Sequence, residues 1–450
     1  MVKKREFSLI IIGAGAAGLS AAWAAARLKA KVLLVEKEKP GGECLYTGCV
    51  PSKSFISAVR TNRTASFPEI KKHIRDIIKK IEPDDSFERY NRLGVATIKG
   101  EAVIKSRHEV IVNGRSYSTR SVIIATGAVP AIPEISGLDK QKYYTSSTIW
   151  GLDKKPGHLL IIGGGAAGLE LGQTFARIGS KVTLLEAAGQ ILPAEDTETA
   201  GFLHEILQKQ IAIHTGISEL NVGKNNITFN HSSKTIRKNF THLLLLAGKK
   251  AVVPSGIRLD TDKRGFIRTN SRLETGIPGI YAIGDVNGKK MLTNSASVQA
   301  WHAVFNALFR PLGLAPRLEH VPYAVFTSPE IARVGPPEKE LDPDSIKKHV
   351  YPFTKLNRAV IENGEDGFIK IITDKKNRIK SVTICGQNAS EMIGEYVLAI
   401  NSGIKADKIA RTSHIYPSMS EAVQFSAAGL TAMPPLTEKI LRFFHSVFQK

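Results

Sequence analysis

The chain has 450 residues, 42% of them hydrophobic, which predicts about three domains of ordinary size. Its 62 Lys and Arg against 41 Asp and Glu leave a net charge of +21. Such a surface favours acidic partners, for example anionic lipid headgroups or an acidic electron-transfer protein, or is simply the basic surface of an enzyme. The positive charges are spread along the chain without a basic tail or an aromatic–basic cluster, which argues against dedicated nucleic-acid binding.

The first elements resemble a signal peptide or a membrane span, because Lys3, Lys4 and Arg5 precede an apolar stretch from Leu9 to Ala26. Three glycines at fixed spacing interrupt this stretch, so we interpret it as a strand, a tight turn and a helix. We expect no transmembrane helix elsewhere.

An internal repeat organises the chain. The segment beginning at Ser8 aligns without a gap, at an offset of 150, with the segment beginning at His158. Each copy contains an apolar strand, a G-x-G-x-x-G turn, a predicted helix, a second strand and an acid. The paired positions are Gly13, Gly15, Gly18 and Glu36 in the first copy and Gly163, Gly165, Gly168 and Glu186 in the second.

This pattern is the dinucleotide-binding fingerprint. The glycines permit the turn and the close approach of a pyrophosphate, which the free N–H groups at the helix N-terminus bind. The acid accepts a hydrogen bond from a ribose hydroxyl. Two copies imply two dinucleotides, most economically one flavin and one nicotinamide. Glu186 would repel a 2′-phosphate, which favours NADH over NADPH, unless its side chain points away and selectivity lies elsewhere.

The cysteines fall into two groups. Three in the whole chain are too few for a disulfide framework, so we expect a cytoplasmic protein. Cys44 and Cys49 lie five residues apart, and in a regular helix that spacing rises ~7.5 Å, too far for a disulfide. We therefore expect an irregular chain at Gly48, followed by a helix whose N-terminus lowers a thiolate pKa. Cys385 sits in a strand pattern and is predicted to be a small core residue.

Three later segments complete the chain. The strand beginning at Ser121 runs into a Gly/Pro loop, and the strand in Gly279–Gly288 ends in Gly-Asp. Asp285 is therefore either a ligand of the flavin ribityl or phosphate region or a simple turn aspartate. From about Val321, alternating runs predict antiparallel strands, then helices, in an α+β domain suited to oligomerisation.

The motifs GAGAAG, GGECLYTGCVPSK, IIATG, GGGAAGLE, YAIGD and VFTSPEIARVG make the chain resemble the class I pyridine nucleotide-disulfide oxidoreductases over essentially its whole length. That family includes glutathione reductase, dihydrolipoyl dehydrogenase and mercuric reductase. The resemblance implies an α/β fold with two Rossmann-like dinucleotide-binding domains, a C-terminal α+β dimerisation domain, and a homodimer whose active sites are completed across the subunits. The implied boundaries are 1–147 and 271–319 for the FAD domain, 148–270 for the NAD(P) domain and 320–450 for the interface domain.

The resemblance also implies roles for individual residues. Cys49 corresponds to the thiol beside the flavin and Cys44 to the thiol that attacks substrate. Lys53 corresponds to the lysine near flavin N5, and Glu170 to its ion-pair partner. The IIATG and YAIGD matches extend the cofactor site to Thr126, Gly127, Gly284 and Asp285.

One departure from the family concerns the acid/base. Disulfide reductases carry a His-Pro with a Glu five residues after the His; here Pro417 and Glu421 match, but Tyr416 stands in the His position and His414 lies two residues earlier. A phenol is a poor general base near neutral pH. Either His414 swings in as the base, or the chain resembles a mercuric-reductase-like branch that acts on a small disulfide or a soft metal ion.

The mercuric-reductase likeness extends to Tyr143, which precedes Thr-Ser as a second active-site tyrosine does there. The chain lacks that branch's C-terminal cysteine pair, and no resident metal site is predicted. Dihydrolipoyl dehydrogenase and a peripheral electron-transfer flavoprotein remain the alternatives.

Two further segments depart from expectation. Residues 247–254 read AGKKAVVP where the family has Gly-Arg-x-Pro-Asn, which weakens inferences about how the nicotinamide domain meets the flavin domain. The C-terminal residues 436–450 are apolar at helical spacing with flanking Lys and Arg. They predict either a membrane-surface helix on the cytoplasmic face or a helix that packs on its own dimer.

Overall fold

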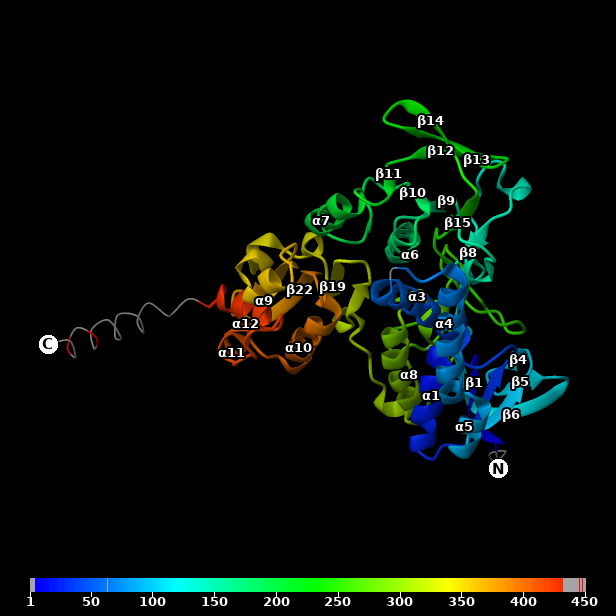
Figure 1. Cartoon of the computed structure of the whole chain (residues 1–450). Coiled ribbons are helices and arrows are strands. Elements are labelled where there is room, and N and C mark those ends of the chain that lie inside the picture. The colour runs from blue at the N-terminus through cyan, green and yellow to red at the C-terminus, as the bar shows by residue number, and fades with distance from the viewer. Residues whose placement is uncertain (1–4, 63, 432–444, 446, 448–450) are drawn as a thin grey trace. The chain divides into compact units, whose positions relative to one another are not determined.

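The computed structural model describes residues 5–62, 64–431, 445 and 447. These residues form two compact units (Figure 1). Unit 1 comprises the described residues up to Pro193 together with His204–Leu318. Unit 2 comprises Ala194–Leu203 together with the described residues from Glu319 onward.

The first sheet of unit 1 begins as predicted, because the apolar N-terminal stretch forms strand β1 and helix α1 on either side of the glycine turn. Four parallel strands follow the order β3-β2-β1-β6, and β17 returns from far along the chain to pair with β6. The first half of β6 pairs with the antiparallel hairpin β4–β5. The bounds are β1 Phe7–Ile12, α1 Ala16–Arg27, β2 Val32–Glu36, β3 Ala96–Lys99, β4 Ala102–Ser106, β5 Glu109–Val112, β6 Arg115–Ile124 and β17 Ile280–Ala282.

Helices α1 and α8 lie side by side against this sheet (Figure 1). Alanines on both helices, such as Ala21 and Ala300, are fully buried with Leu9 and Ile11 of β1, because small side chains let the helix axes approach the strands. The segment between β2 and β3 supplies four more helices. The bounds are α2 Gly42–Tyr46, α3 Cys49–Thr61, α4 Phe67–Ile81, α5 Phe87–Arg92 and α8 Thr293–Leu308.

The second sheet of unit 1 repeats this plan around the second glycine turn. Five parallel strands follow the order β11-β10-β9-β15-β8, and α6 follows the turn as α1 does in the first copy. A small antiparallel sheet, β12-β13-β14, and the pair β7–β16 complete the unit. The bounds are β7 Ala128–Pro130, β8 Tyr144–Thr145, β9 His158–Ile162, α6 Ala166–Arg177, β10 Lys181–Glu186, β11 Ala212–Thr215, β12 Ser218–Gly223, β13 Asn226–His231, β14 Lys234–Asn239, β15 His242–Leu245 and β16 Lys249–Ala251.

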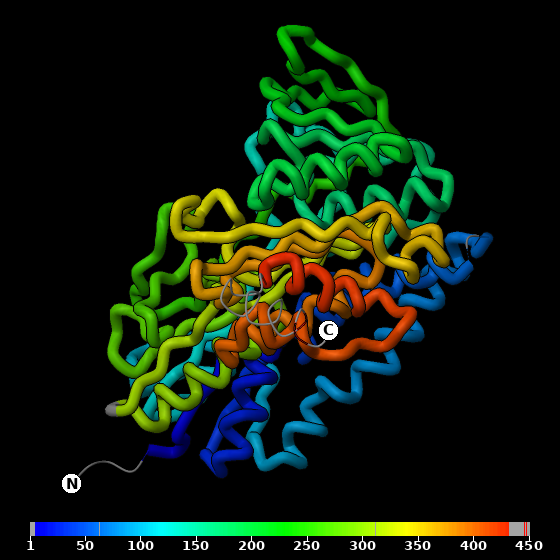
Figure 2. The backbone as a smooth tube through the Cα atoms, turned by 90° about the vertical axis from the view of Figure 1, so that its left-hand side faces the viewer, coloured from blue at the N-terminus to red at the C-terminus, as the bar shows by residue number. Residues whose placement is uncertain are grey.

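Unit 2 is built on five antiparallel strands in the order β18-β19-β22-β21-β20, which run alongside one another as the yellow-to-orange tubes of Figure 2. Cys385 lies on β22 and is fully buried, which confirms it as a core residue. Helices α10 and α12 share a core cluster with other residues of this strand, Val382 and Ile384. The bounds are β18 Tyr323–Val325, β19 Glu330–Val334, β20 Ile346–Pro352, α9 Asn357–Ile361, β21 Phe368–Asp374, β22 Ile379–Gly386, α10 Ala389–Ser402, α11 Ala406–Ala410 and α12 Glu421–Ala428.

Ion pairs attach Ala194–Leu203 to unit 2, although the sequence places this segment within the range 148–270. Lys370 is 1% exposed, and its Nζ lies 2.9 Å from Asp196, 3.1 Å from Glu198 and 3.0 Å from Glu338. A buried ammonium is tolerated only when carboxylates surround it. The first half of α7 (Thr197–Leu207) therefore belongs to the unit that holds Lys370.

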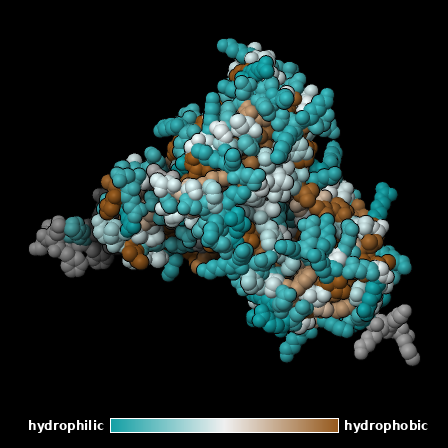
Figure 3. Space-filling model, turned by 45° about the vertical axis from the view of Figure 1, so that its right-hand side comes forward, coloured by the Kyte–Doolittle hydropathy of each residue, from teal (hydrophilic) through white to brown (hydrophobic). Residues whose placement is uncertain are grey.

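Hydrophilic side chains predominate on the face shown in Figure 3, as a chain with 23% charged residues leads one to expect. Within the described part of the chain, no helix combines the length and the apolar character that crossing a membrane requires. The predicted amphipathic segment 436–450 falls outside the described residues except for His445 and Val447, so its role stays a prediction.

Candidate functional site

Both glycine turns have backbone geometry that a side chain would disrupt. Gly13 and Gly163 have φ values of +101° and +121°, and a Cβ on either would lie 2.4 Å from the carbonyl oxygen of Ala125 or Leu246, respectively. The third glycine of each turn packs on the first, since a Cβ there would lie 1.8 Å or 2.0 Å from that glycine's carbonyl oxygen. The glycines at these positions therefore serve turn geometry and helix–strand packing.

The acid at the end of each second strand binds its own glycine turn. Glu36 accepts hydrogen bonds from the N–H of Ala14 at 2.7 Å and of Glu38 at 2.9 Å. Glu186 accepts from the N–H of Gly164 at 2.7 Å and of Ala188 at 2.8 Å. Each carboxylate is thus held beside the turn, and its remaining lone pairs can accept a ribose hydroxyl.

The middle glycines face the space that a pyrophosphate requires. Gly15 and Gly165 are the N-caps of α1 and α6, and no described side chain caps either helix. A Cβ on Gly15 would meet only the Cα of Gly42 at 3.9 Å, and no described atom lies within 4 Å of a Cβ on Gly165. Free N–H groups, a helix N-terminus and an acid on the ribose side fit a dinucleotide at each turn.

The two cysteines lie on separate helices, as their spacing requires. Helix α2 ends at Tyr46 and α3 begins at Cys49, and the N–H of Gly48 turns back to the carbonyl of Glu43 at 2.6 Å. The Thr293 hydroxyl oxygen lies 3.4 Å from Sγ of Cys44 and 3.8 Å from Sγ of Cys49. A single hydroxyl from α8 thus contacts both sulfurs.

The sulfurs are electrostatically unequal. A hydrogen bond from the Cys44 thiol, assisted by Lys53 and Thr293, lowers the pKa of Cys49 to about 6, although burial works against the charge. The same hydrogen bond, together with burial, raises the pKa of Cys44. At neutral pH the reduced pair therefore holds a thiolate on Cys49 and a thiol on Cys44. The Cys44 S–H donates a hydrogen bond to the Cys49 sulfur.

An ion pair joins the cysteine helix to the second glycine-turn helix. Lys53 Nζ on α3 lies 2.8 Å from Glu170 Oε2 on α6, and the Glu170 side chain is only 4% exposed. Lys53 stands four residues after Cys49 and so shares its face of α3. The structure thereby brings Glu170 to Lys53 on the cysteine helix, although the sequence separates the two by 117 positions.

A second cluster was not predicted. Lys249 is the first residue of β16, and its Nζ lies 2.7 Å from the Glu43 carboxylate and 2.8 Å from the Asp285 carboxylate. Burial disfavours the ammonium, but the two carboxylates outweigh it and raise the pKa of Lys249. The only sequence signal was the Gly-Lys-Lys where Gly-Arg is typical. Asp285, predicted to bind the flavin chain, is thus already held by a cation. Thr293 was also missed, because a threonine at the start of a helix carries no distinctive pattern.

The remaining predicted cofactor residues follow the carboxyl ends of β6 and β17 in the first sheet. The Thr126 hydroxyl donates to the carbonyl of Val252. Gly127 and Gly284 have φ values of +71° and +72°, and a Cβ on Gly284 would lie 2.9 Å from that of Ala17 on α1. Their contacts with a cofactor stay predictions.

The predicted acid/base residues lie in unit 2. Tyr416 is 68% exposed, and its hydroxyl accepts a 3.3 Å hydrogen bond from Asn357. Glu421 is buried and accepts from the N–H of Ser418 at 3.2 Å. His414 is held by Glu395 at 3.0 Å and by the carbonyl of Thr412 at 3.0 Å.

Tyr143 packs against the core of the second sheet with Leu138 and Leu160. This placement gives it a packing contact, and a catalytic role for it stays a prediction.

Comparisons with known proteins agree on one family. The model of the pyridine nucleotide-disulphide oxidoreductases matches residues 7–300, and the model of the dimerisation domain of that family matches 321–427. Dihydrolipoyl dehydrogenase of Thermus scotoductus is 33% identical over 95% of this chain and 98% of its own length. Mercuric reductase of Bacillus cereus is 29% identical over 94% of this chain and 71% of its own length.

Solved structures agree as well. The Cu(II) complex of the HOCl-induced flavoprotein disulfide reductase RclA from Escherichia coli superposes with a TM-score of 0.82 at 26% identity, covering 94% of this chain and all of RclA. LpdA from Mycobacterium tuberculosis gives a TM-score of 0.84 at 26% identity, with 94% and 100% covered.

Proposed function

The chain belongs to the pyridine nucleotide-disulphide oxidoreductase family, and from this premise we propose that it uses NADH to reduce a soft metal ion or a small disulfide through Cys44 and Cys49. Family membership makes it an FAD-dependent oxidoreductase that uses NAD(P)H. The match to a dimerisation domain supports a homodimer. The choice of NADH rests on Glu186, whose carboxylate stands where a 2′-phosphate would need a cation.

When bound, the two dinucleotides supply hydride and two-electron chemistry. The chain's residues do the rest. Lys53, fixed by Glu170, places a positive charge on the Cys49 face of α3, and charge of that sign stabilises electron density that develops nearby. Cys49 is held as a thiolate, and Cys44 retains a proton until it meets the acceptor.

The observation that carries the choice of acceptor is the acid/base position. A disulfide substrate leaves as a thiol and needs a proton, which a histidine normally delivers. Here Tyr416 stands in that place, and His414 is engaged by Glu395 and by the backbone of Thr412. A metal ion needs no such proton, because two thiolates bind it directly. The likeness to a copper-bound flavoprotein disulfide reductase supports the same choice.

The electron balance is simple for each acceptor. One NADH carries two electrons, which reduce two Cu(II) to two Cu(I), or one Hg(II) to Hg(0), with release of NAD+ and one proton. A disulfide instead consumes one NADH and one proton and yields two thiols. Only the second reaction requires a proton donor at the position of Tyr416.

The test is anaerobic oxidation of NADH by the purified flavoprotein with Cu(II), Hg(II), glutathione disulfide, coenzyme A disulfide, lipoamide and quinones as acceptors. We expect turnover with a metal ion to exceed turnover with any disulfide by about tenfold or more, since one missing general acid costs about 10²-fold. Tyr416→His should raise disulfide turnover and leave metal turnover unchanged. Ile415→His, at an equally exposed neighbour, is the matched control and should change neither.

Dihydrolipoyl dehydrogenase is the second candidate, favoured by the Thermus scotoductus relative at 33% identity. In that case the unaltered protein would oxidise dihydrolipoamide with NAD+ at a rate typical of enzymes, about 1–10³ per second. That result, with Tyr416→His giving no further gain, would reject the metal-ion proposal.

A further inference from the structure

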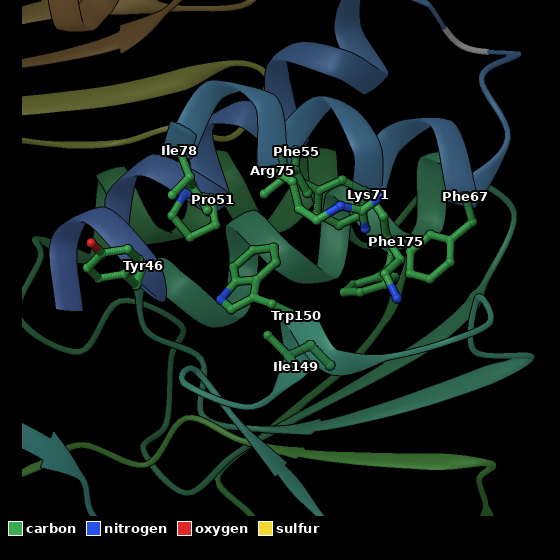
Figure 4. Close-up of a pocket in the computed structure, with 11 residues that line it drawn as sticks. Tyr46, Pro51, Phe55, Phe67, Lys71, Arg75, Ile78, Ile149, Trp150 and Phe175 are labelled. Atoms are coloured by element: carbon green, nitrogen blue, oxygen red, sulfur yellow. The ribbon is translucent and has the colours of Figure 1, made fainter. Parts of the chain in front are cut away.

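An apolar cavity lies behind the cysteine helix, within unit 1. It has a volume of about 210 Å³ and is bounded by α3, α4, α6 and the turn that carries Trp150 (Figure 4). We call it the α3–α4 pocket and define it by the lining residues on which its chemistry rests: Tyr46, Phe55, Lys71, Arg75, Trp150 and Phe175.

The pocket is separate from the redox site because it uses the opposite face of α3. Cys49 and Lys53, four residues apart, face Thr293 and Glu170. Pro51 and Phe55, also four apart, line the pocket. The two pairs are offset by two residues, or about 200° around a helix. An occupant of the pocket would therefore touch neither sulfur.

The floor of the pocket is a rigid group of aromatic rings. The Phe55 ring packs edge-on against Phe175, with centroids 4.9 Å apart, and against Trp150 at 6.4 Å. Phe55 and Phe175 are 1% and 2% exposed. Neighbouring side chains therefore enclose both rings and prevent them from turning into the cavity. The Trp150 indole is held in place because its Nε1 donates to the carbonyl of Thr47 at 2.8 Å. Such a floor is preformed for another flat ring.

The two charged side chains that line the pocket are both cationic. Lys71 and Arg75 stand four residues apart on α4 and so project from the same face, beside Ile74 and Ile78. Lys71 Nζ donates to the carbonyl of Leu152, which fixes the ammonium at the pocket. The described residues that line the cavity include no Asp or Glu. The complementary ligand therefore carries a negative charge next to an apolar body.

We propose that the α3–α4 pocket binds a single-ring aromatic carboxylate. A dry cavity of about 150 Å³ accommodates benzene, so 210 Å³ suits one ring with a carboxylate, and is below the range of about 300 Å³ and above in which drug-sized ligands bind. The ring packs against Trp150 and Ile78, and the carboxylate accepts from Lys71 and Arg75. The arrangement commits the site to a planar anion of this size.

The position of the pocket links it to the cysteine loop. The Trp150 indole donates a hydrogen bond to the carbonyl of Thr47. Tyr46, another lining residue, directly precedes Thr47, and both Tyr46 and Thr47 lie between Cys44 and Cys49. Binding is nevertheless measurable without NADH or any electron acceptor. Failure of the pocket and failure of the proposed redox function are therefore separate results.

The test is equilibrium dialysis of radiolabelled benzoate against the purified, full-length flavoprotein. We expect one benzoate per chain. Benzamide, which has the same shape without the charge, should bind roughly tenfold more weakly, since hydrogen bonds between charged groups are stronger than those of a neutral amide. Arg75→Gln, at an exposed position, should weaken benzoate binding by a similar factor. Lys79→Gln, one turn further along α4 and outside the lining, is the matched control and should bind as the unaltered protein does.

A variant that fills the α3–α4 pocket tests benzoate binding without changing the charge of the protein. Ile78→Trp places a larger ring in the half-buried Ile78 position and should abolish binding of benzoate while the protein keeps its flavin absorbance. Equal binding of benzoate and benzamide would overturn the anionic ligand class. Benzoate binding that survives Ile78→Trp, or no saturable binding up to about 10 mM, a weak limit on the usual affinity scale, would overturn the site.

Discussion

The two glycine turns have the same local geometry but different surroundings. In both, the acid accepts a hydrogen bond from a backbone N–H of the turn at 2.7 Å. The loop after the second strand also returns to the turn. The Gly41 N–H donates to the carbonyl of Ala14 at 2.8 Å in the first copy, and the Leu192 N–H donates to the carbonyl of Gly164 at 2.9 Å in the second. In the first copy the next residue, Gly42, packs backbone to backbone, since a Cβ on it would lie 2.9 Å from Gly15 Cα. In the second copy the loop returns through a leucine, and the space around Gly165 is open.

We propose that this difference in packing distinguishes the turn of a retained flavin from the turn of an exchanging nicotinamide. The loop covering the first turn continues directly into α2 and Cys44, so we propose that one short piece of backbone holds both the flavin phosphates and the sulfurs. In the second copy the returning loop leaves no described atom within 4 Å of a Cβ on Gly165, and this open space suits a nicotinamide that must exchange at every turnover. One fingerprint thus serves retention or exchange according to what packs against it.

The strongest test of this comparison is a pair of glycine substitutions. Gly13→Ala and Gly163→Ala each force a Cβ to 2.4 Å from a carbonyl oxygen at positive φ. We expect Gly13→Ala to prevent recovery of a folded, yellow protein, because the loop of Gly41 and Gly42, which leads into α2, packs directly on the first turn. Gly163→Ala should keep FAD but lower kcat/KM for NADH by roughly 10²-fold, the cost of a misplacement of about 1 Å. The FAD-to-protein ratio and NADH kinetics measure both effects, and an unchanged kcat/KM for NADH in Gly163→Ala would contradict the geometry.

The next largest effect is expected from removing the Cys44 thiol, because the loop at the second turn carries no cysteine. Cys44→Ala removes the hydrogen bond that does most to lower the pKa of Cys49 to about 6. The thiolate is then less stable, so the pKa rises and the midpoint of alkylation by iodoacetamide moves to higher pH. Below pH 6 both proteins should react slowly, and near pH 7 the unaltered protein should react faster. Cys385→Ala, at a buried strand position, should leave the midpoint unchanged; an unchanged midpoint in Cys44→Ala would refute the assigned hydrogen bond.

A smaller effect is expected where Lys249 ties the first loop to Asp285. Lys249→Gln leaves Glu43 and Asp285 without their shared cation, so both carboxylates would repel an anionic cofactor chain. We expect FAD affinity to fall by roughly tenfold, about one like-charge contact, and Lys249→Arg to restore it. Lys250→Gln is the neighbouring control. FAD retention during dialysis measures the loss, and retention equal to that of the unaltered protein would exclude this role for Lys249.

The smallest effect concerns nucleotide choice at the second turn. Glu186→Gln keeps an acceptor oxygen but removes the charge that opposes a 2′-phosphate. The ratio of kcat/KM for NADH to that for NADPH should fall about twofold to fivefold, within the range of one surface charge contact. The matched variant Glu36→Gln should leave this ratio unchanged, because its turn binds the other dinucleotide. A ratio insensitive to Glu186 would place the selectivity elsewhere.

The sequence by itself determined the parts of this protein that depend on local chemistry. Glycine is required at positions 13 and 163 because the backbone there has a positive φ. The acids at positions 36 and 186 accept hydrogen bonds from the N–H groups of the turns. The helix breaks at Gly48 because a continuous helix would hold the two cysteines too far apart for a disulfide. Alternation of apolar residues was enough to predict the antiparallel strands β21 and β22, and a strand pattern was enough to place Cys385 in the core.

Only the tertiary structure decided which distant side chains meet. Thr293 reaches both sulfurs from a position 244 residues beyond Cys49, Lys249 joins Glu43 to Asp285, and Lys370 draws Ala194–Leu203 into unit 2. These contacts arise because parallel sheets return distant segments to one edge and because a buried charge must find its opposite wherever the chain supplies it. Neither cause leaves a periodic mark in the sequence.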